Sequence, residues 1–348
     1  MQIASFRHLL WTLLLCAPVT GYAQVRPEEP YTFLRTHIGY TDADLKALDA
    51  GKAVTRAIDT KEPREVAISG AVHIRATTDF FLRMYKDIER FDTAALAIKK
   101  ISDPPQREDF ATMSIPEKEL AALRTCKPDD CNMKLGQTTM DILASDIDWT
   151  QPDANRRAEE IIRERAYVGT MAYLENGNAS LGAYRDQAKP AFVAKEFEAL
   201  LDASPYILAY RPELHEYLRN YPNAELESAT DFLYWSAYDY GKPVLRISHV
   251  TIYPIEEGMN ASAIVTGKQV FFSHFFMAGL ELHALVRDTK SESEAFYLVS
   301  LIRMRTDGVG GLFGNMLKKS VQKDVMKNMQ AYLDASKAAI ERYYLDRR

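Results

Sequence analysis

The side chains best suited to chemistry are three histidines in the last third of the chain, His249, His274 and His283. The segments that carry them are rich in aromatic and β-branched residues, so facing strands could bring two imidazoles into one cavity. There an imidazole would bind a polar head group or act as a base near neutral pH. For each histidine the alternative is a hydrogen-bonded or surface position. The chain has no His-Glu-x-x-His run and no histidine pair with zinc-helix spacing, so we expect no metal and no cofactor.

Aromatic residues gather in the same region. They are Tyr234, Trp235, Tyr238, Tyr240, Tyr253, Phe271, Phe272, Phe275 and Phe276. Alternation along a strand sends half of them inward, where they either pack an ordinary core or line an apolar ligand pocket. The residues that we predict to bind a ligand are Tyr234, Trp235, Tyr238, His249, Tyr253, His274 and Phe276.

Two glycine-containing segments do not fit the reactive motifs closest to them. Residues 177–182 have one residue too many before Ser180 for a nucleophile elbow, and no strand precedes them. The glycines at 308, 310, 311 and 314 lack the Gly-Lys-Ser/Thr ending of a phosphate-binding loop. We interpret these glycines as letting a helix start pack closely or leaving a cavity mouth mobile. We predict no catalytic residue.

Cys126 and Cys131 enclose the short turn Lys-Pro-Asp-Asp. The gap of four residues differs from the two-residue gap of thioredoxin-type redox sites, and no histidine lies nearby to complete a zinc site. In an oxidising compartment, two cysteines around such a turn favour a structural disulfide. We therefore predict a bond between Cys126 and Cys131.

The first 23 residues have the pattern of a secretory signal peptide. Arg7 precedes a short apolar run, and the small residues Gly21 and Ala23 suit a cleavage site after Ala23. The run is too short to span a bilayer, although a membrane anchor is the alternative, and Leu15 argues against lipidation of Cys16. We expect a periplasmic or secreted protein. The formal net charge of −5 gives no basic surface for nucleic acid.

The first half of the mature chain predicts mixed elements. A short helix should begin after Thr41, strands should occupy residues 54–58 and 66–74, and a helix should follow Thr77. We expect strands joined by short turns between residues 104 and 131. From 138 to 221 the pattern is helical, with helices after Asp153, over 190–202 and over 212–220. The alternating charges between 156 and 165 indicate a solvated helix face.

The final third returns to strands and closes with a helix. Segments 232–238, 244–254, 261–276, 280–286 and 295–305 are divided by short turns, as in an antiparallel meander. After Asp307, apolar residues recur at helical spacing up to Ile340. A helix of about thirty residues would be about 45 Å long, enough to cross a sheet from rim to rim.

The order of these elements resembles the START-like group, also called the helix-grip or polyketide cyclase/dehydrase (SRPBCC-type) superfamily. The resemblance rests on the segment from Asp307 with its closing helix, on Asp231-Phe-Leu-Tyr-Trp-Ser and His249-Val-Thr-Ile-Tyr, and on residues 69–88. It implies an α+β fold in which a curved antiparallel sheet grips the long helix around an apolar cavity. Residues 138–221 depart from the compact pattern. We therefore expect a signal peptide (1–23), a START-like domain in two parts (24–137 and 222–348) and a helical insertion (138–221).

The resemblance implies an exported protein that binds a hydrophobic, lipid-like small molecule, with peripheral membrane contact also open. The first alternative is a hydrolase or cyclase that uses a cavity histidine. The second is an envelope protein whose helical insertion docks a partner protein, which would require a large exposed apolar patch on residues 153–220. The group contains enzymes and plain binding proteins, so the fold alone does not choose between them. We favour binding without catalysis, and the sequence predicts no oligomeric state.

Overall fold

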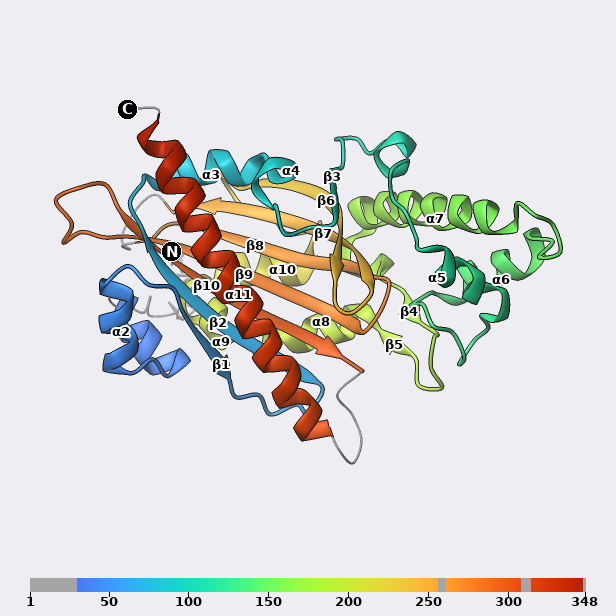
Figure 1. The fold of residues 1–348 in the computed structure, drawn as a ribbon, viewed down its shortest axis with the longest axis horizontal. Helices are drawn as coiled ribbons and strands as arrows, with labels where there is room; N and C mark the ends of the chain where they lie inside the picture. The colour runs from blue at the N-terminus through green and yellow to red at the C-terminus, as the bar shows by residue number, and fades with distance from the viewer. Residues whose placement is uncertain (1–29, 256–260, 308–313, 347–348) are drawn as a thin grey trace, which may run out of the picture.

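The computed structural model describes residues 30–255, 261–307 and 314–346 (Figure 1). The predicted signal peptide and its cleavage site lie outside the described residues, as do the glycines at 308, 310 and 311. Eight strands form one curved antiparallel sheet in the order β1-β2-β10-β9-β8-β7-β6-β3. They are β1 (Val54–Ile58), β2 (Glu65–Ile74), β3 (Ala97–Lys100), β6 (Thr230–Asp239), β7 (Pro243–Pro254), β8 (Ala261–Phe272), β9 (Phe276–Arg287) and β10 (Phe296–Thr306). A separate two-stranded ribbon pairs β4 (Ala183–Tyr184) with β5 (Ala191–Phe192).

Helices cover both faces of the sheet. The α-helices are α1 (Pro30–Phe33), α2 (Asp42–Asp49), α3 (Thr78–Lys86), α4 (Ile88–Phe91), α5 (Glu117–Ala122), α6 (Gln137–Asp146), α7 (Ala154–Asn176), α8 (Val193–Asp202), α9 (Pro205–Tyr210), α10 (Pro212–Asn220) and α11 (Gly314–Leu345). We call the face under α11 the inner face and the opposite one the outer face (Figure 1). None of the helices in the described part of the chain is long and apolar enough to cross a membrane.

The long helix α11 lies across β1 and β2 on the inner face. Alternation along β2 turns Val66, Ile68, Val72 and Ile74 toward it, and all four are buried. Gly70 lies on the same face. A larger residue would not fit there, because a Cβ would lie 2.5 Å from the Met329 sulfur. The predicted α+β helix-grip fold is therefore confirmed, with the helix held by a strand that has no side chain at the point of closest approach.

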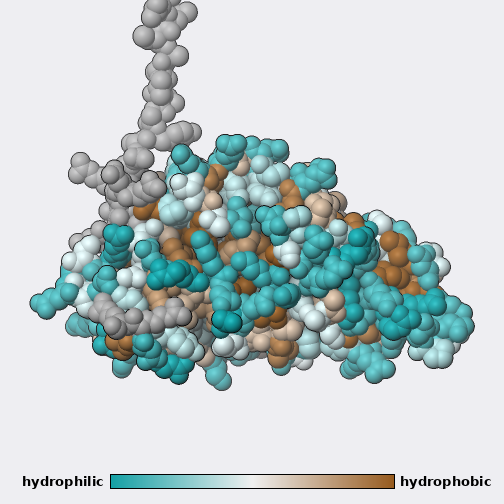
Figure 2. Space-filling view, turned by 90° about the horizontal axis from the view of Figure 1, so that it is seen from above, coloured by the Kyte–Doolittle hydropathy of each residue, from teal (hydrophilic) through white to brown (hydrophobic). Residues whose placement is uncertain are grey.

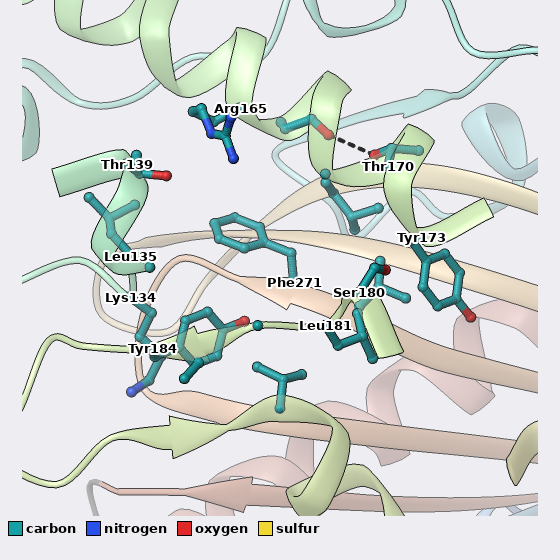
Figure 3. Close-up of a pocket in the computed structure, with 18 of the residues that line it drawn as sticks. Lys134, Leu135, Thr139, Arg165, Thr170, Tyr173, Ser180, Leu181, Tyr184 and Phe271 are labelled. Carbon is teal, nitrogen blue, oxygen red and sulfur yellow. Dashed lines mark hydrogen bonds between the residues drawn. The ribbon is translucent and has the colours of Figure 1, made fainter. Parts of the chain in front are cut away.

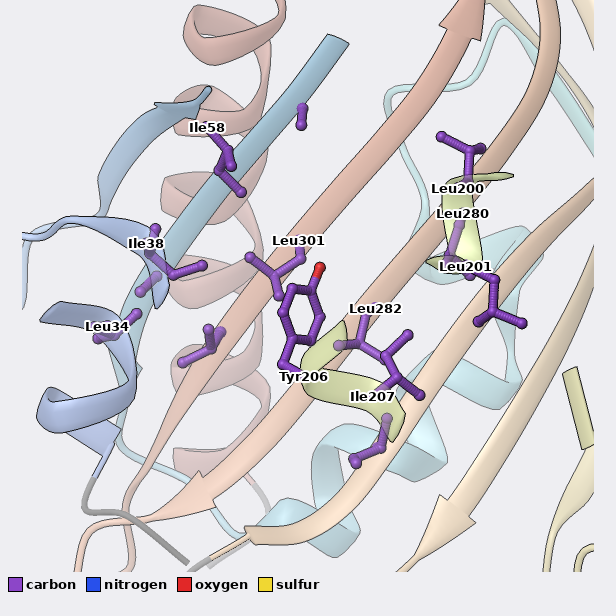
Figure 4. Packing of buried hydrophobic residues seen from close by; sticks show 14 of the residues in the cluster. Leu34, Ile38, Ile58, Leu200, Leu201, Tyr206, Ile207, Leu280, Leu282 and Leu301 are labelled. Carbon is purple, nitrogen blue, oxygen red and sulfur yellow. The ribbon is translucent and has the colours of Figure 1, made fainter. Parts of the chain in front are cut away.

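The outer face is covered by the N-terminal helices and by α8 to α10. Figure 4 shows leucines of α8 and an aromatic side chain of α9 against apolar side chains of β9 and β10. Tyr206 of α9 also accepts a hydrogen bond from Arg303 of β10, at 3.4 Å. The sequence prediction missed α9, a short helix that begins at Pro205 between the predicted helices 190–202 and 212–220. The sheet is thus covered on both sides, so most strand side chains are buried whichever face they occupy.

The prediction of strands between residues 104 and 131 is wrong. That segment forms α5 and two short 3₁₀ turns, Arg107–Phe110 and Leu123–Thr125. Its buried apolar residues keep no regular spacing of two, because only Met113 and Ile115 are two apart, so no single face of a strand could bury them all. They are Phe110, Met113, Ile115, Leu120 and Leu123. They join the core under α7 instead. The predicted disulfide is confirmed: Cys126 and Cys131 are bonded, with their Cα atoms 4.5 Å apart.

Candidate functional site

The residues predicted to bind a ligand lie on different faces of the sheet. Tyr234 and Phe276 pack with residues of α11 on the inner face, and Tyr238 shares that face with Tyr234 by alternation. Trp235 and His249 face outward: Trp235 donates to the carbonyl of Asp109 at 2.7 Å, and His249 contacts α7. Tyr253 also faces outward, where it donates to Glu213 of α10 at 3.0 Å. His274 lies in the turn between β8 and β9. The structure therefore does not gather these residues into one site.

A charged pair occupies the middle of the inner face. Arg246 of β7 donates to Glu281 of β9 at 2.7 Å. Its other nitrogens donate to the hydroxyls of Tyr234 at 3.1 Å, Tyr238 at 3.0 Å and Ser236 at 3.1 Å. Burial raises the pKa of both tyrosines, so their hydroxyls stay protonated. The guanidinium thus has acceptors for all of its nitrogens.

Amide and hydroxyl groups extend this inner network along the neighbouring strands. Gln269 donates to Glu281 at 3.2 Å, and Ser248 donates to Gln269 at 2.5 Å. His283 lies on the same face and its Nδ1 is 2.8 Å from the hydroxyl of Ser300. Burial lowers the pKa of His283. The inner face is therefore not the uniformly apolar cavity surface that the family resemblance implied, because its centre is a hydrogen-bonded polar network.

A second polar cluster surrounds His249 on the outer face. Its Nδ1 lies 2.8 Å from the hydroxyl of Tyr173 and its Nε2 lies 3.0 Å from Asp231. Asp231 also accepts hydrogen bonds from Tyr217 at 2.7 Å and from Thr251 at 2.6 Å. Burial lowers the pKa of His249, so the neutral imidazole is favoured. Both ring nitrogens are occupied by protein groups.

The three histidines have separate sets of partners. His249 and His283 lie on opposite faces of the sheet. His274 is bonded through Nδ1 to Ser273 at 2.8 Å and through Nε2 to Glu119 of α5 at 3.0 Å. Burial lowers the pKa of His274. Each imidazole is thus hydrogen-bonded within the fold.

A cavity of about 200 Å³ lies between α7 and the outer face of the sheet (Figure 3). We call it the α7 cavity. Its residues come from α7, the sheet, segments 134–139 and 180–184, and the start of α8: Lys134, Leu135, Gly136, Thr139, Ile162, Arg165, Ala166, Gly169, Thr170, Tyr173, Ser180, Leu181, Gly182, Ala183, Tyr184, Val193, Ile247, Val270 and Phe271. Most of them are apolar, and the small residues among them leave the space open.

Most of the polar side chains around the α7 cavity are used by the protein itself. Thr170 donates to the Ala166 carbonyl at 2.8 Å, Ser180 donates to the Gly177 carbonyl at 2.8 Å, and Tyr184 accepts from the Phe272 amide at 2.9 Å. The hydroxyl of Tyr173 is bonded to His249 and turns away from the cavity in Figure 3. Lys134 is paired with Asp186 at 3.1 Å and with Asp307.

Arg165 differs from these groups. Its side chain extends from α7 toward Phe271 in Figure 3. Its Nε is buried without a hydrogen-bond partner, and within the described ranges its guanidinium forms no salt bridge. Sequence analysis missed it because residues 156–165 looked like a solvated face. A signal was present, because Arg165 is three residues after Ile162 and four before Gly169, on the stripe that lines the cavity.

Comparison with known proteins gives distant structural likenesses, among them two to crystal structures. No family model matches the chain, and no curated protein does. The crystal structure of Ara h 8.0201 aligns with 31% of this chain at 14% identity and a TM-score of 0.21, and the chain spans 65% of that protein's length. The di-domain aromatase/cyclase (ARO/CYC) StfQ from the steffimycin biosynthetic pathway aligns over 85% of each chain at 12% identity and a TM-score of 0.24. At these TM-scores neither likeness bears on function.

Proposed function

We propose that this protein binds a small, mainly apolar molecule in the α7 cavity without transforming it. The observation that carries the proposal is the cavity itself, which is about 200 Å³ in volume and is walled largely by apolar side chains. Filling a largely apolar cavity of this size with an apolar ligand is favourable, because the ligand removes apolar surface from water. At the packing density of protein interiors, a cavity of this volume holds a ligand of on the order of ten non-hydrogen atoms.

The inner face is the competing place for the ligand. There an apolar molecule would have to lie against Arg246 and Glu281, and separating either charge from its partners is strongly unfavourable. A ligand in the α7 cavity separates no such charges, because the polar side chains of the cavity other than Arg165 and Thr139 keep their hydrogen bonds within the protein. We therefore place the ligand under α7.

The same proposal includes export to the periplasm or outside the cell. The signal pattern in residues 1–23 supports it, and the Cys126–Cys131 disulfide is compatible with an oxidising compartment. A docking function has less support, because the exposed large hydrophobic side chains between 153 and 220 are Met171, Phe192 and Leu208, one from each of three elements. The face in Figure 2 is mainly hydrophilic, with hydrophobic residues in separate small groups.

Titration calorimetry with 1-octanol and octanoate tests the proposal. Burying an eight-carbon chain is worth about 6 kcal/mol, which corresponds to a Kd on the order of 0.1 mM. We expect one site in the wild type, loss of binding in Ala166→Phe, whose ring fills the α7 cavity, and unchanged binding in Tyr238→Phe on the inner face. Binding that survives Ala166→Phe but is lost in Tyr238→Phe would place the ligand under α11. Failure of both compounds to bind the wild type would overturn the proposed function.

A further inference from the structure

We infer that the α7 cavity selects a small monocarboxylate, with the carboxylate on Arg165 and the apolar tail against the sheet. The inference rests on the proposed function, since it assigns the chemical class of the ligand for the same cavity. It is carried by the one cationic side chain of the cavity wall for which the described residues provide no acceptor.

Arg165 is an exception among the arginines of α7. Arg156 is paired with Asp153 at 2.8 Å and Glu160 at 2.5 Å, and Arg163 is paired with Glu159 at 2.8 Å. Those pairs are the solvated face that the charge pattern predicts. Arg165 is half-buried and has no such pair within the described ranges, and its Nε is removed from solvent.

A guanidinium with one buried, unpaired donor favours an anionic ligand. The Nε–H of Arg165 is buried without an acceptor, which is unfavourable by the desolvation of that one donor, and a ligand oxygen removes this penalty. The arginine as a whole is half-buried, so its remaining N–H groups are within reach of a ligand that enters from solvent. A planar carboxylate matches the fork of a guanidinium with two parallel hydrogen bonds. The hydroxyl of Thr139 lines the same cavity and forms no side-chain hydrogen bond with the described residues, so it can donate to the same carboxylate.

The cavity wall has one positive charge that is not paired with a carboxylate, that of Arg165, which matches a ligand with a single negative charge. Lys134 is the other cation of the lining, and Asp186 and Asp307 already neutralise it. A phosphate monoester, which carries nearly two negative charges at neutral pH, would leave charge without a partner in an apolar space. A single carboxylate is balanced by Arg165 alone. The volume of about 200 Å³ leaves room for a short alkyl chain or one aromatic ring behind it.

Calorimetry with octanoate and 1-octanol at pH 7 tests the inference, because the two compounds share a tail and differ in charge. We expect the wild type to bind octanoate 10- to 100-fold more tightly than 1-octanol, as charge-assisted hydrogen bonds imply. Arg165→Gln should remove this preference and leave the Kd of 1-octanol within threefold. Arg156→Gln, a change of an exposed arginine on the same helix, should leave both affinities unchanged.

The outcomes separate the inference from the function on which it rests. Equal affinities in the wild type, or a preference that persists in Arg165→Gln, would overturn carboxylate recognition while 1-octanol binding upheld the cavity. Lack of binding by both compounds would overturn the proposed function as well. Arg165→Lys adds a further check: a lysine keeps the charge but loses the fork, so we expect an octanoate affinity between those of the wild type and Arg165→Gln.

Discussion

Replacing Lys268 by methionine should change how stability depends on pH. Lys268 lies on the outer face of β8, where it is 1% exposed. Its ammonium group lies over the rings of Tyr173, at 4.8 Å, and Phe197, at 4.5 Å, and it donates to Asn178. No carboxylate pairs with it among the described residues. Burial therefore lowers the pKa of Lys268 to about 7.

The sign and size of the effect follow from proton binding in the two states. In the unfolded chain the pKa of this lysine returns to about 10.4. Between pH 7 and pH 9 the unfolded chain therefore keeps a proton that the native state releases, so the free energy of unfolding rises with pH. With a native pKa of about 7, this contribution grows by about 2 kcal/mol over that window. In the Lys268→Met variant it is absent.

Urea denaturation at pH 7, 8 and 9 measures the effect. We expect the stability difference between wild type and Lys268→Met to shift by about 2 kcal/mol in favour of the wild type from pH 7 to pH 9. Lys46→Met, at an exposed lysine of α2, is the control and should give a curve parallel to the wild type. Parallel curves for Lys268→Met as well would show that Lys268 stays charged in the fold and would refute the reasoning.

Three further outcomes follow from the fold. Arg246→Met should lower the free energy of unfolding by about 3 kcal/mol, because Glu281 is left charged on the buried inner face, and adding Glu281→Leu should restore much of it; additive losses in denaturation would contradict this. Gly70→Val should lower the free energy of unfolding by about 1–3 kcal/mol, and with it the melting temperature, because the new side chain collides with α11. An unchanged melting temperature would argue against the close approach. Acidification from pH 7 to pH 5 should destabilise the protein, because burial lowers the native pKa of His249 and His283 and the unfolded chain takes up more protons below pH 6.5; stability that rises on acidification would contradict the assigned burial.

Much of the fold could be predicted because its signals are local. Strand β2 follows from apolar residues two apart, and α11 follows from an apolar stripe at helical spacing. The Cys126–Cys131 bond follows from a short turn between the two cysteines. These features depend on neighbours within a few residues, so the chain displays them without its tertiary partners. The segment between 104 and 131 was mispredicted because its buried apolar residues are irregularly spaced in the sequence and are buried by tertiary contacts in the core under α7.

The candidate site could not be predicted in the same way. Tyr234 and Trp235 are adjacent in sequence but point to opposite faces, and the sequence does not say which face meets α11 and which meets α7. Arg165 looks like its paired neighbours on α7 until the sheet is placed beside it.

By itself, then, the sequence determined the types of most elements, the antiparallel meander and the disulfide. The tertiary structure alone decided which side chains face each other across the sheet and that the inner face carries a charged network. It also decided that Arg165, which has no carboxylate partner among the described residues, lies beside the α7 cavity. The physical reason is that periodicity and turn chemistry act within a few residues, whereas a cavity and an unpaired charge depend on groups that come from distant parts of the chain.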